Sequence, residues 1–372
     1  MKLLYVFPEP LPLERARGIQ TVFTVRSIAQ QGIDTVLAHV PSDGDPFLAC
    51  AIERPAGVEL MPVSHRLPWP LARIHSNRIF MARLGARVRW GEIGVVMARH
   101  LKAARSLLER HSALPLIYEA HEVFADTVPS HRSETMAHLE NFVVERAAVL
   151  IANSQATANR LRERYRGAGK IEVVPNGVDV PGSIPDKDWA HAGEHIVYAG
   201  SFFGWKGVED LVIASRELGR MRITLMGGDG AAIERLCVMA DSGGAQLDFT
   251  GRVSHERVAE ALKHACIAVL PNRADPDSAF TSPIKLFEYM AAGCALVASD
   301  LPSVREILDE GEAAWVPPGD AKALARAIRG LAEDPARAQA MGARLRAKAA
   351  RYSWDARGER LAGLLRPLLL ER

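Results

Sequence analysis

The residues most able to do chemistry gather in the string TSPIKLFEYMAAGCALVASD, which begins at Thr281. Ser282 is a natural N-cap and Pro283 a natural first helical residue, so together they predict a well-defined helix start before Ile284. The free N–H groups of that first turn could hold phosphate oxygens. Glu288 follows within two turns, and its carboxylate could accept both hydroxyls of a ribose. A capped helix with a solvated glutamate is the simpler alternative, but the length of the string favours a binding site.

A second group of polar residues follows the apolar run at Ile196–Ala199. The strand predicted there ends at Gly200–Ser201, and Lys206–Gly207 begins the next helix. An ammonium at a helix N-terminus adds positive charge to the helix dipole, and this combination suits a diphosphate. Lysine is also common on protein surfaces, so spacing alone leaves the two interpretations even.

Two further candidates follow predicted strands in the first half of the chain. Gly18 begins a helix in ERARGIQTVF, where a missing side chain would let a phosphate approach the backbone, with Arg15 and Arg17 nearby. His121 follows the strand in LIYEAHE, beside Glu119. Taken alone, such a glycine more often serves a turn, and such a histidine is more often a hydrogen-bonded structural residue than a catalyst.

Patterns for metals and disulfides are weaker. Three D-x-D pairs, beginning at Asp43, Asp186 and Asp275, lie in loops without a common context, so we expect no metal site. The GGDG string at 227–230 lacks the last glycine of a dinucleotide fingerprint and predicts a structural turn. The cysteines are widely spaced and form no C-x-x-C pair, so we expect buried free thiols in a reducing compartment. They are Cys50, Cys237, Cys266 and Cys294.

The elements that must position these candidates alternate between short apolar runs and amphipathic helical stretches. The first series of predicted strands is Leu3–Phe7, Thr35–Val40, Val95–Ala98, Leu116–Tyr118 and Leu150–Ala152. The second series is Ile196–Ala199, Ile223–Met226, Leu247–Thr250, Ile267–Leu270 and Ala295–Ala298. Helices are expected at Gln20–Gln31 and Glu134–Ala147. Strands that are apolar on both faces and separated by helices indicate parallel sheets, and ligands bind beyond the carboxyl ends of such strands.

The length and the net charge of the chain limit the classes of protein to which it can belong. A chain of 372 residues predicts two domains at ~100–200 residues each, with the Pro-, Gly- and Asp-rich segment Pro175–His195 as the linker. The net charge of +2 argues against a dedicated nucleic-acid binder, which needs a surplus of basic residues. No run reaches the ~18 apolar residues of a membrane span, and the proline-interrupted N-terminus is too short for a signal peptide. We therefore expect a cytoplasmic protein.

One segment departs from this balance. From Met61 to Gly91 there is no acidic residue, and six arginines occur: Arg66, Arg73, Arg78, Arg83, Arg87 and Arg89. Apolar residues interleave with them: Ile74, Phe80, Met81, Leu84, Val88 and Trp90. The segment Arg66–Trp90 is therefore either a basic amphipathic surface for an anionic membrane or a helix face that packs on its own domain. The sequence weighs these two alternatives evenly.

Several of these strings together resemble the retaining GT-B glycosyltransferases of the "group 1" (family four) class, over nearly the whole chain. The motifs are the glycine loop at Gly18, VVPNGVD at Val173–Asp179, YAGSFFGWKG at Tyr198–Gly207, LDFTGRV at Leu247–Val253 and SPIKLFEYMAAG at Ser282–Gly293. The resemblance implies an α/β GT-B fold with two Rossmann-like, doubly wound domains facing across a cleft. Residues 1–180 would bind the acceptor and 181–353 the nucleotide-sugar donor, while 354–372 would form a helix that crosses back to the first domain.

The resemblance also implies a role for each candidate. Lys206 would neutralise the donor diphosphate, and Glu288 would hold the ribose. The backbone at Gly18 and at Ser282, Pro283 and Ile284 would line the phosphates, and Arg252 and Val253 would flank the base. His121 would contact the transferred sugar on the face where the new bond forms.

Two positions depart from the family pattern. Ser201, counted with the donor-binding residues, stands where the family commonly has a basic residue. A second cation would then come from one of three alternatives: Arg15, Arg17 or Arg273. Phe280 stands eight positions before Glu288, where the family often has a glutamate that touches donor-sugar hydroxyls. That contact is either missing or supplied by Asp277 or Thr281.

The activity implied is retaining, metal-independent transfer of a sugar from a UDP- or GDP-linked donor to a hydroxyl of a carbohydrate or lipid-linked acceptor, in cell-surface polysaccharide or glycolipid synthesis. No cofactor is expected, because the nucleotide sugar is a co-substrate. Two alternatives stay open. One is an isomerase of the nucleotide-sugar 2-epimerase kind, which would need carboxylates around the sugar and is disfavoured by Phe280. The other is a non-catalytic GT-B partner protein, against which Lys206, Glu288 and His121 argue.

Overall fold

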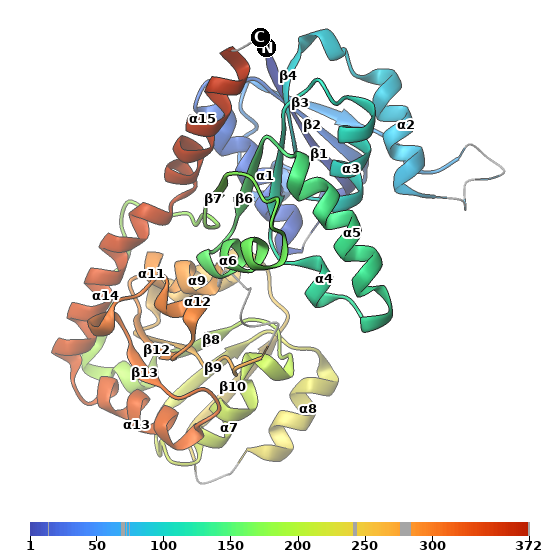
Figure 1. The fold of residues 1–372 in the computed structure, drawn as a ribbon. Coiled ribbons are helices and arrows are strands. Elements are labelled where there is room, and N and C mark those ends of the chain that lie inside the picture. The colour runs from blue at the N-terminus through green and yellow to red at the C-terminus, as the bar shows by residue number, and fades with distance from the viewer. Residues whose placement is uncertain are drawn as a thin grey trace. The chain divides into compact units, whose positions relative to one another are not determined.

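The computed structural model describes residues 1–13, 15–67, 71, 73, 75–240, 244–275 and 284–370. It divides into two units (Figure 1). Unit 1 contains Met1–Gly177 together with Trp354–Arg372, and unit 2 contains Val178–Ser353. The first boundary therefore falls between 177 and 178 rather than between 180 and 181, and the last segment of the chain groups with the first unit.

Unit 1 is built on a seven-stranded parallel sheet with the order β3-β2-β1-β4-β5-β6-β7. The strands are β1 (Lys2–Leu11), β2 (Thr35–Pro41), β3 (Val58–Pro62), β4 (Ile93–Ala98), β5 (Leu116–Ala120), β6 (Val149–Ala152) and β7 (Ile171–Val173). The five strands expected from apolar runs are all present, whereas β3 and β7 were missed. Both are edge strands, and an edge strand can carry polar residues such as Glu59 and Glu172 that weaken the apolar pattern.

Successive side chains of β1 pack on opposite faces of this sheet, as the pleat requires. Leu4 and Val6 join the core under α2 (Asn77–Arg87), α3 (Leu101–Arg110), α5 (Ser130–Arg146) and α6 (Gln155–Arg164). Leu3, Tyr5 and Phe7 join the core under α1 (Ala16–Gln30) and α15 (Trp354–Leu370). A short helix, α4 (Phe124–Thr127), precedes α5. Helices therefore cover both faces of the sheet, as the doubly wound pattern predicted.

The arginine-rich segment contains α2. The buried apolar face of this helix decides between a membrane-facing apolar surface and a helix face that packs on its own domain. Phe80 and Leu84 are fully buried and Met81 is 5% exposed, all within the core of unit 1. The apolar side of α2 therefore packs on its own domain and is not free to enter a membrane. Arg66, Arg73 and Arg78 are exposed, and Ile74 lies outside the described residues. No helix among the described residues is long and apolar enough to cross a membrane.

Unit 2 is built on a six-stranded parallel sheet with the order β10-β9-β8-β11-β12-β13. The strands are β8 (Ile196–Ala199), β9 (Arg222–Met226), β10 (Gln246–Gly251), β11 (Ile267–Leu270), β12 (Ala295–Ser299) and β13 (Ala314–Val316). The helices are α7 (Val208–Ser215), α8 (Gly230–Met239), α9 (His255–His264), α11 (Ile284–Ala291), α12 (Pro302–Arg305), α13 (Ala321–Ala332) and α14 (Pro335–Ala349). One continuous hydrophobic cluster fills this unit.

The segment expected to be an aperiodic linker is largely part of unit 2. Trp189–Glu194 forms a 3-10 helix in which Ala192 is fully buried. Lys187 Nζ donates hydrogen bonds to the carbonyls of Leu262 and Lys263 at the end of α9. The expectation of a free linker over Pro175–His195 was therefore wrong for its second half, because these contacts fold it onto the domain.

The cysteines also differ in part from the expectation. All four are free, and Cys266 and Cys294 are buried. Cys50 is partly exposed and Cys237 is exposed on α8. The prediction of free thiols is therefore confirmed, but the prediction that they are buried is correct only for the pair in unit 2.

Each sheet has one point where the strand order reverses, and this point decides where a ligand can bind. In unit 1 the order reverses between β1 and β4, and in unit 2 between β8 and β11. In open α/β sheets the loops that leave the carboxyl ends of these two strands diverge and leave a crevice. The loops after β8 and β11 are therefore the first place to look for a nucleotide site in unit 2.

Candidate active site

A buried tyrosine fixes α11 against the end of β8. The Tyr289 hydroxyl accepts a hydrogen bond from the Ala199 N–H at 2.9 Å and lies 3.3 Å from the Ala199 carbonyl. Ala199 is the last residue of β8, and the next residues are Gly200 and Ser201. This contact places the neighbouring Glu288 at the carboxyl end of the sheet, beside the point where the strand order reverses.

The Glu288 carboxylate is engaged on both oxygens. Oε1 lies 3.0 Å from His255 Nε2 and Oε2 lies 2.9 Å from Lys285 Nζ, and the carboxylate is only 11% exposed. Burial alone would raise the pKa of Glu288, but Lys285 and His255 outweigh it and the pKa is lowered. Glu288 is therefore a fixed anion with two hydrogen-bond donors already directed at it.

His255 was not predicted as a site residue. It is the first residue of α9, directly after the N-cap Ser254, and its side chain is 52% exposed. The hydrogen bond to Glu288 raises the pKa of His255, while burial and Lys285 oppose this effect. The only signal in the sequence is its place two residues beyond Val253, because a pairing across 33 residues leaves no local pattern.

Lys206 ends a 3-10 turn over Gly204–Lys206, and Gly207 separates this turn from α7. Of the pair Lys206–Gly207 expected to begin the helix, Gly207 is the N-cap of α7 and Lys206 precedes it as the last residue of the 3-10 turn. Its Nζ lies 3.8 Å from the centre of the Trp205 ring, and it forms no ion pair with any described residue. Burial and the positive charge of Lys285 lower the pKa of Lys206 to about 8. An anion bound here would stabilise this unpaired ammonium.

Two of the three alternatives for a second cation are already paired. Arg273 donates two hydrogen bonds of 2.7 Å to the Asp210 carboxylate, one from Nε and one from Nη2. Arg17 lies 2.6 Å from Glu9 in unit 1. Arg273 is therefore committed to holding its loop on α7, which removes it as a free partner for a diphosphate.

The remaining donor-site candidates of unit 2 lie at the same carboxyl edge. The Ser201 carbonyl accepts a hydrogen bond from the Tyr198 hydroxyl at 2.8 Å. Arg252 is exposed and Val253 is partly buried against the core, both just after β10. Ile284 is the first described residue of α11. Ser282 and Pro283 lie outside the described residues, as do Phe280, Asp277 and Thr281.

Glycines let the loops of this edge approach one another closely. The Gly227 N–H donates to the Gly251 carbonyl at 2.8 Å, and a Cβ at Gly227 would lie 1.9 Å from the Gly200 carbonyl oxygen. Asp229 then caps α8 by accepting from the Ala232 N–H at 3.0 Å. The GGDG string therefore has the structural role that its incomplete fingerprint predicted.

Gly18 has a packing role that needs no ligand. It is buried in the first turn of α1, and a Cβ added there would lie 2.5 Å from the Leu13 carbonyl oxygen and 2.6 Å from the Leu13 Cβ. Leu13 therefore fills the space in which a phosphate was expected. The predicted phosphate contact at Gly18 stays a prediction, and its main argument is removed.

The second candidate of unit 1, His121, lies in the most deeply buried charge network of the described chain. Its Nε2 is 3.0 Å from Glu119 Oε1, although the two groups are not aligned as a hydrogen bond. Burial and Arg99 lower the pKa of His121 to about 4, against the opposing effect of Glu119. Burial would raise the pKa of Glu119, but His121 and Arg357 lower it. At neutral pH the pair is therefore a neutral imidazole beside a carboxylate.

The returning helix α15 completes this network. Arg357, 3% exposed, pairs with Glu119 Oε1 and donates to the carbonyls of Val174 and Pro175. The Tyr5 hydroxyl donates to Glu119 Oε2 at 3.1 Å. Arg357 was missed, yet it stands on the buried stripe of α15 with Trp354, Leu361 and Leu365, and a charge in an apolar stripe is a signal that could have found it.

Acidic pairs with the D-x-D form have local structural roles where they are described. Asp45 accepts hydrogen bonds from the N–H groups of Phe47 and Leu48. Asp188 accepts from the N–H of His191 and contacts its ring. Asp277 lies outside the described residues. In the described ranges no three His, Cys, Asp or Glu side chains come together as a metal site.

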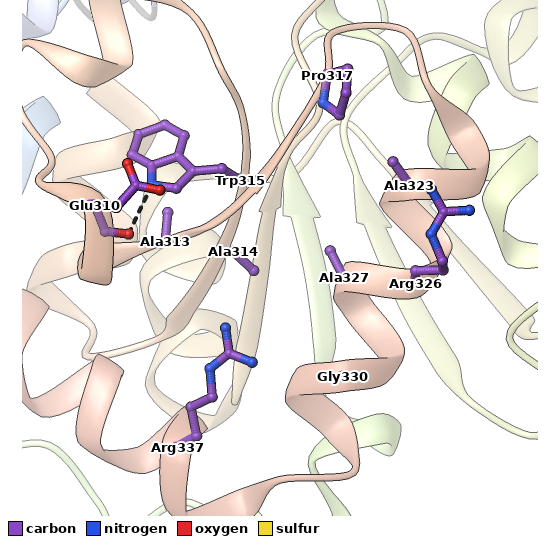
Figure 2. Close-up of a pocket in the computed structure, with 10 residues that line it drawn as sticks. All are labelled: Glu310, Ala313, Ala314, Trp315, Pro317, Ala323, Arg326, Ala327, Gly330 and Arg337. Carbon is purple, nitrogen blue, oxygen red and sulfur yellow. Dashed lines mark hydrogen bonds between the residues drawn. The ribbon is translucent and has the colours of Figure 1, made fainter.

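A hollow of about 580 Å³ lies in unit 2 between the edge strand β13 and the helices α13 and α14 (Figure 2). It contains none of the predicted site residues. Trp315 donates a hydrogen bond from Nε1 to the Glu310 carbonyl, and small residues such as Ala327 and Gly330 leave the space open. This hollow is the gap beside an edge strand and is separate from the loops after β8 and β11.

Two protein-family models match the chain, one in each unit. The family model "Glycosyltransferase Family 4" matches residues 7–180, and the model "Glycosyl transferases group 1" matches residues 193–334. The chain belongs to the group 1, family 4 glycosyltransferases. The first match covers most of unit 1 and ends three residues beyond the boundary at 177, and the second match lies within unit 2.

Individual relatives in this family are distant. A phosphatidyl-myo-inositol mannosyltransferase of Mycolicibacterium smegmatis is 31% identical over 53% of this chain and 52% of its own length. A D-inositol 3-phosphate glycosyltransferase of Catenulispora acidiphila is 27% identical over 74% of this chain and 72% of its own. For the first relatives matched, the mannosyltransferase and an alpha-D-kanosaminyltransferase of Streptomyces kanamyceticus, the chain covers only about half of their length.

Solved structures show the same fold. A sucrose-phosphate synthase of Thermosynechococcus elongatus matches with a TM-score of 0.78 at 21% identity, over the full length of both chains. Anabaena HepE in complex with UDP and glucose matches with a TM-score of 0.73 at 17% identity, over 98% of this chain and 99% of that one. The α/β GT-B fold implied by the sequence motifs is thereby confirmed.

Proposed function

We propose that this family 4 member is a retaining glycosyltransferase. It moves a sugar from a UDP- or GDP-linked donor to a hydroxyl of a carbohydrate or lipid-linked acceptor, in the synthesis of a polysaccharide or glycolipid. Unit 2 binds the donor, and unit 1 supplies His121 and binds the acceptor. Support from relatives comes from the mannosyltransferase named above, and HepE is a structural neighbour that binds UDP and glucose.

Two charged groups at the carboxyl edge of the unit 2 sheet carry the proposal. One is the fixed Glu288 carboxylate, and the other is the Lys206 ammonium, which has no ion-pair partner among the described residues. The buried Glu288 carboxylate can accept the hydroxyls of a ribose, as the sequence motif predicted. Lys206, which has no ion-pair partner among the described residues, offers its ammonium to a diphosphate. Lys285 acts electrostatically on both groups, which links them into one site. A nucleoside diphosphate carries the anion that Lys206 lacks and ribose hydroxyls that can bind the Glu288 carboxylate.

The reaction follows from these charges. The acceptor oxygen bonds to the anomeric carbon as the bond from that carbon to the diphosphate oxygen breaks. The departing phosphate takes the acceptor proton, and its negative charge is stabilised by the Lys206 ammonium and by backbone N–H groups. Attack from the face that the leaving group vacates retains the anomeric configuration. In this proposal the ammonium neutralises the diphosphate, and no resident metal or cofactor takes part.

His121 acts on the sugar as a neutral hydrogen-bonding group. A lowered pKa of about 4 keeps its imidazole uncharged at neutral pH, so it can accept or donate a hydrogen bond without bringing a cation to the reacting carbon. Its contact with Glu119 is close but poorly aligned in the free protein. Such contacts commonly tighten when the substrate is bound.

We also propose that the protein contacts an anionic membrane peripherally, through electrostatic attraction alone. The exposed arginines of the Arg66–Trp90 segment can attract anionic lipids, while the apolar face of α2 is buried. Co-sedimentation with anionic and with neutral vesicles tests this contact. Binding to anionic vesicles that is lost at high salt supports it, and equal binding to both kinds contradicts it.

Product analysis tests the proposed activity. Purified protein is incubated with UDP- and GDP-sugars, first alone and then with simple glycosides as acceptors, and the products are identified by mass spectrometry and NMR. The proposal predicts release of the nucleoside diphosphate together with a new glycoside of the donor's anomeric configuration. An epimerised sugar nucleotide formed from the donor alone would instead identify an isomerase, and binding without any turnover would identify a non-catalytic partner protein.

A further inference from the structure

Asn272 is a buried polar residue at the point where the strand order of unit 2 reverses. It is the second residue after β11 and is 4% exposed. Its Oδ1 is buried and has no hydrogen-bond partner in the described part of the chain. A buried amide left without a partner destabilises the folded protein, and in native structures such groups are rare. The described part of the free chain therefore supplies no hydrogen-bond donor to this Oδ1.

The backbone around Asn272 is fastened to the loop that carries Lys206. On one side, the Arg273 N–H donates to the Trp205 carbonyl at 2.8 Å. On the other side, Gly207 is so close that a Cβ there would lie 1.8 Å from the Pro271 carbonyl oxygen. Contacts at 271 and 273 thus hold residue 272 against the segment 205–207. The loop that carries the partnerless Oδ1 of Asn272 is therefore fastened to the loop that carries the Lys206 ammonium.

The side chain of Arg273 makes this arrangement rigid. Its two 2.7 Å hydrogen bonds to Asp210 tie the loop after β11 to the first turn of α7. The loop cannot easily turn Asn272 out to solvent without breaking this pair. The unsatisfied amide is therefore maintained by its surroundings, as at preorganised binding sites.

The chemistry of the amide selects its partner. Oδ1 can only accept a hydrogen bond. The ionised oxygens of a diphosphate also only accept, so a phosphate cannot satisfy this atom. A half-turn of the amide would exchange Oδ1 with Nδ2, since the two are assigned by their contacts. A hydroxyl both donates and accepts, so it satisfies the amide in either orientation, while a phosphate satisfies only one. A sugar hydroxyl is therefore the better partner.

We propose that Asn272 binds a hydroxyl of the donor sugar, beside Lys206 and in place of the glutamate contact for which this chain has Phe280. The inference rests on the proposed function, because it assumes that the site holds a sugar nucleotide. Asn272 then determines affinity for the sugar portion of the donor, and Lys206 determines affinity for the diphosphate.

Calorimetric titration separates the two roles. Wild-type protein, Asn272→Ala and Lys206→Ala are each titrated with nucleoside diphosphates and with the corresponding sugar nucleotides. Asn272→Ala is expected to weaken sugar-nucleotide binding roughly threefold to tenfold, the usual effect of one hydrogen bond, and to leave nucleoside-diphosphate binding unchanged. Lys206→Ala is expected to weaken both ligands together.

Two outcomes of the titration overturn the inference while the proposed function stands. If Asn272→Ala weakens both ligands equally, the amide binds the nucleoside-diphosphate portion that the two ligands share and not the donor sugar. If it weakens neither while Lys206→Ala weakens both, Asn272 is no ligand-binding residue. Failure of the wild type to bind any of these ligands would overturn the proposed function itself.

Thermal unfolding provides a readout that a structural role would move in the opposite direction. Removal of a buried Oδ1 that has no partner should leave the melting temperature of Asn272→Ala unchanged or raised. The control is Asn153→Ala, because Asn153 is a buried asparagine with both ends satisfied by His121 and Thr157. That variant should melt lower. A similar loss of stability in Asn272→Ala would show that the amide supports the fold, which contradicts the proposal.

Discussion

At the scale of single residues, the two units differ in whether their buried charges are paired. In unit 1 the charges are mutually satisfied, since Arg357, Tyr5 and His121 all contact the Glu119 carboxylate. In unit 2 the Lys206 ammonium has no counter-charge among the described residues. An unpaired charge has a free-energy cost that an anionic ligand removes, whereas a paired one mainly orients its neighbours. We therefore propose that the site of unit 2 binds the charged part of the donor and that Glu119, Arg357 and Tyr5 position His121 in unit 1.

The Glu288–His255 pair predicts a pH dependence of nucleotide binding. Glu288 raises the pKa of His255 above 6.5, so protonated His255 holds Oε1 of the carboxylate at low pH and competes with the ribose. Lys285 and Asp179 also act on this histidine, in opposite directions. We expect nucleoside-diphosphate affinity to rise with pH through the pKa of His255 more steeply in the wild type than in a variant without this imidazole, because loss of the Lys206 proton near pH 8 opposes the rise in both. Titrations between about pH 5.5 and 8.5 measure this difference.

His255→Asn provides the control for this dependence. The phosphate groups and Lys206 titrate in the same range, but they do so equally in the wild type and the variant. The difference between the two curves therefore isolates His255. Parallel curves over the whole range would show that the histidine does not compete for Glu288.

The Glu119 carboxylate should matter for turnover more than for donor binding. Glu119→Gln removes the charge beside His121 and leaves the buried Arg357 without its anion, so we expect kcat to fall with little change in nucleoside-diphosphate affinity. Loss of a buried ion pair typically costs roughly 3–5 kcal/mol in the free energy of unfolding. Tyr5→Phe is the matched control, because it removes one hydrogen bond to the same carboxylate and keeps the charge. A kcat of Glu119→Gln equal to that of Tyr5→Phe would contradict a positioning role.

At the scale of elements, the central strands were predictable and the contacts between loops were not. Runs such as Ile196–Ala199 and Ile267–Leu270 are buried on both faces, so their apolar pattern is continuous and their limits were correct. Helix starts were less accurate, and α1 begins at Ala16 rather than Gln20. Asn272 carried no visible signal, because its significance depends on how the loops after β8 and β11 meet.

A substitution at Gly207 tests the contact between the loop after β8 and the loop after β11. Its φ of +67° favours glycine, and a Cβ there would collide with the Pro271 carbonyl. Gly207→Ala should lower the free energy of unfolding by at least about 1–2 kcal/mol, the usual cost of a left-handed conformation for other residues, and should displace Lys206. Gly204→Ala, in the same turn but with open space around the added Cβ, is the control. Equal stability of the two variants in denaturant titrations would refute this packing.

At the scale of the whole molecule, the chain contains two units with separate cores, and one of them is discontinuous in sequence. The cluster of unit 2 runs from Val178 to Ala349, whereas one cluster of unit 1 includes Leu361 and Leu365 from α15. Length and alternation were enough to predict two domains. That α15 also delivers Arg357 to Glu119 depends on a contact across 238 residues, which local patterns cannot reveal.

This discontinuity predicts different behaviour for two fragments. Residues 178–353 should fold alone, with a cooperative thermal transition, because all their core contacts are internal. Residues 1–177 should fail to fold cooperatively, because they lack the buried side of α15 and leave Glu119 without Arg357. Circular dichroism of both fragments measures this. A cooperative transition in 1–177 would show that α15 is dispensable for unit 1.

We propose that the loops after β8 and β11 bind the nucleoside diphosphate of a sugar donor through Lys206 and Glu288. A thermal-shift panel of nucleoside diphosphates and sugar nucleotides tests it most directly, on the wild type and on Lys206→Ala, Glu288→Ala and the exposed control Lys322→Ala. We predict that ligands of one base stabilise the wild type and Lys322→Ala, and that Lys206→Ala and Glu288→Ala each lose the shift and most of their transfer activity. Absence of a shift with every ligand in the wild type, or an undiminished shift in Lys206→Ala and Glu288→Ala, would contradict the claim.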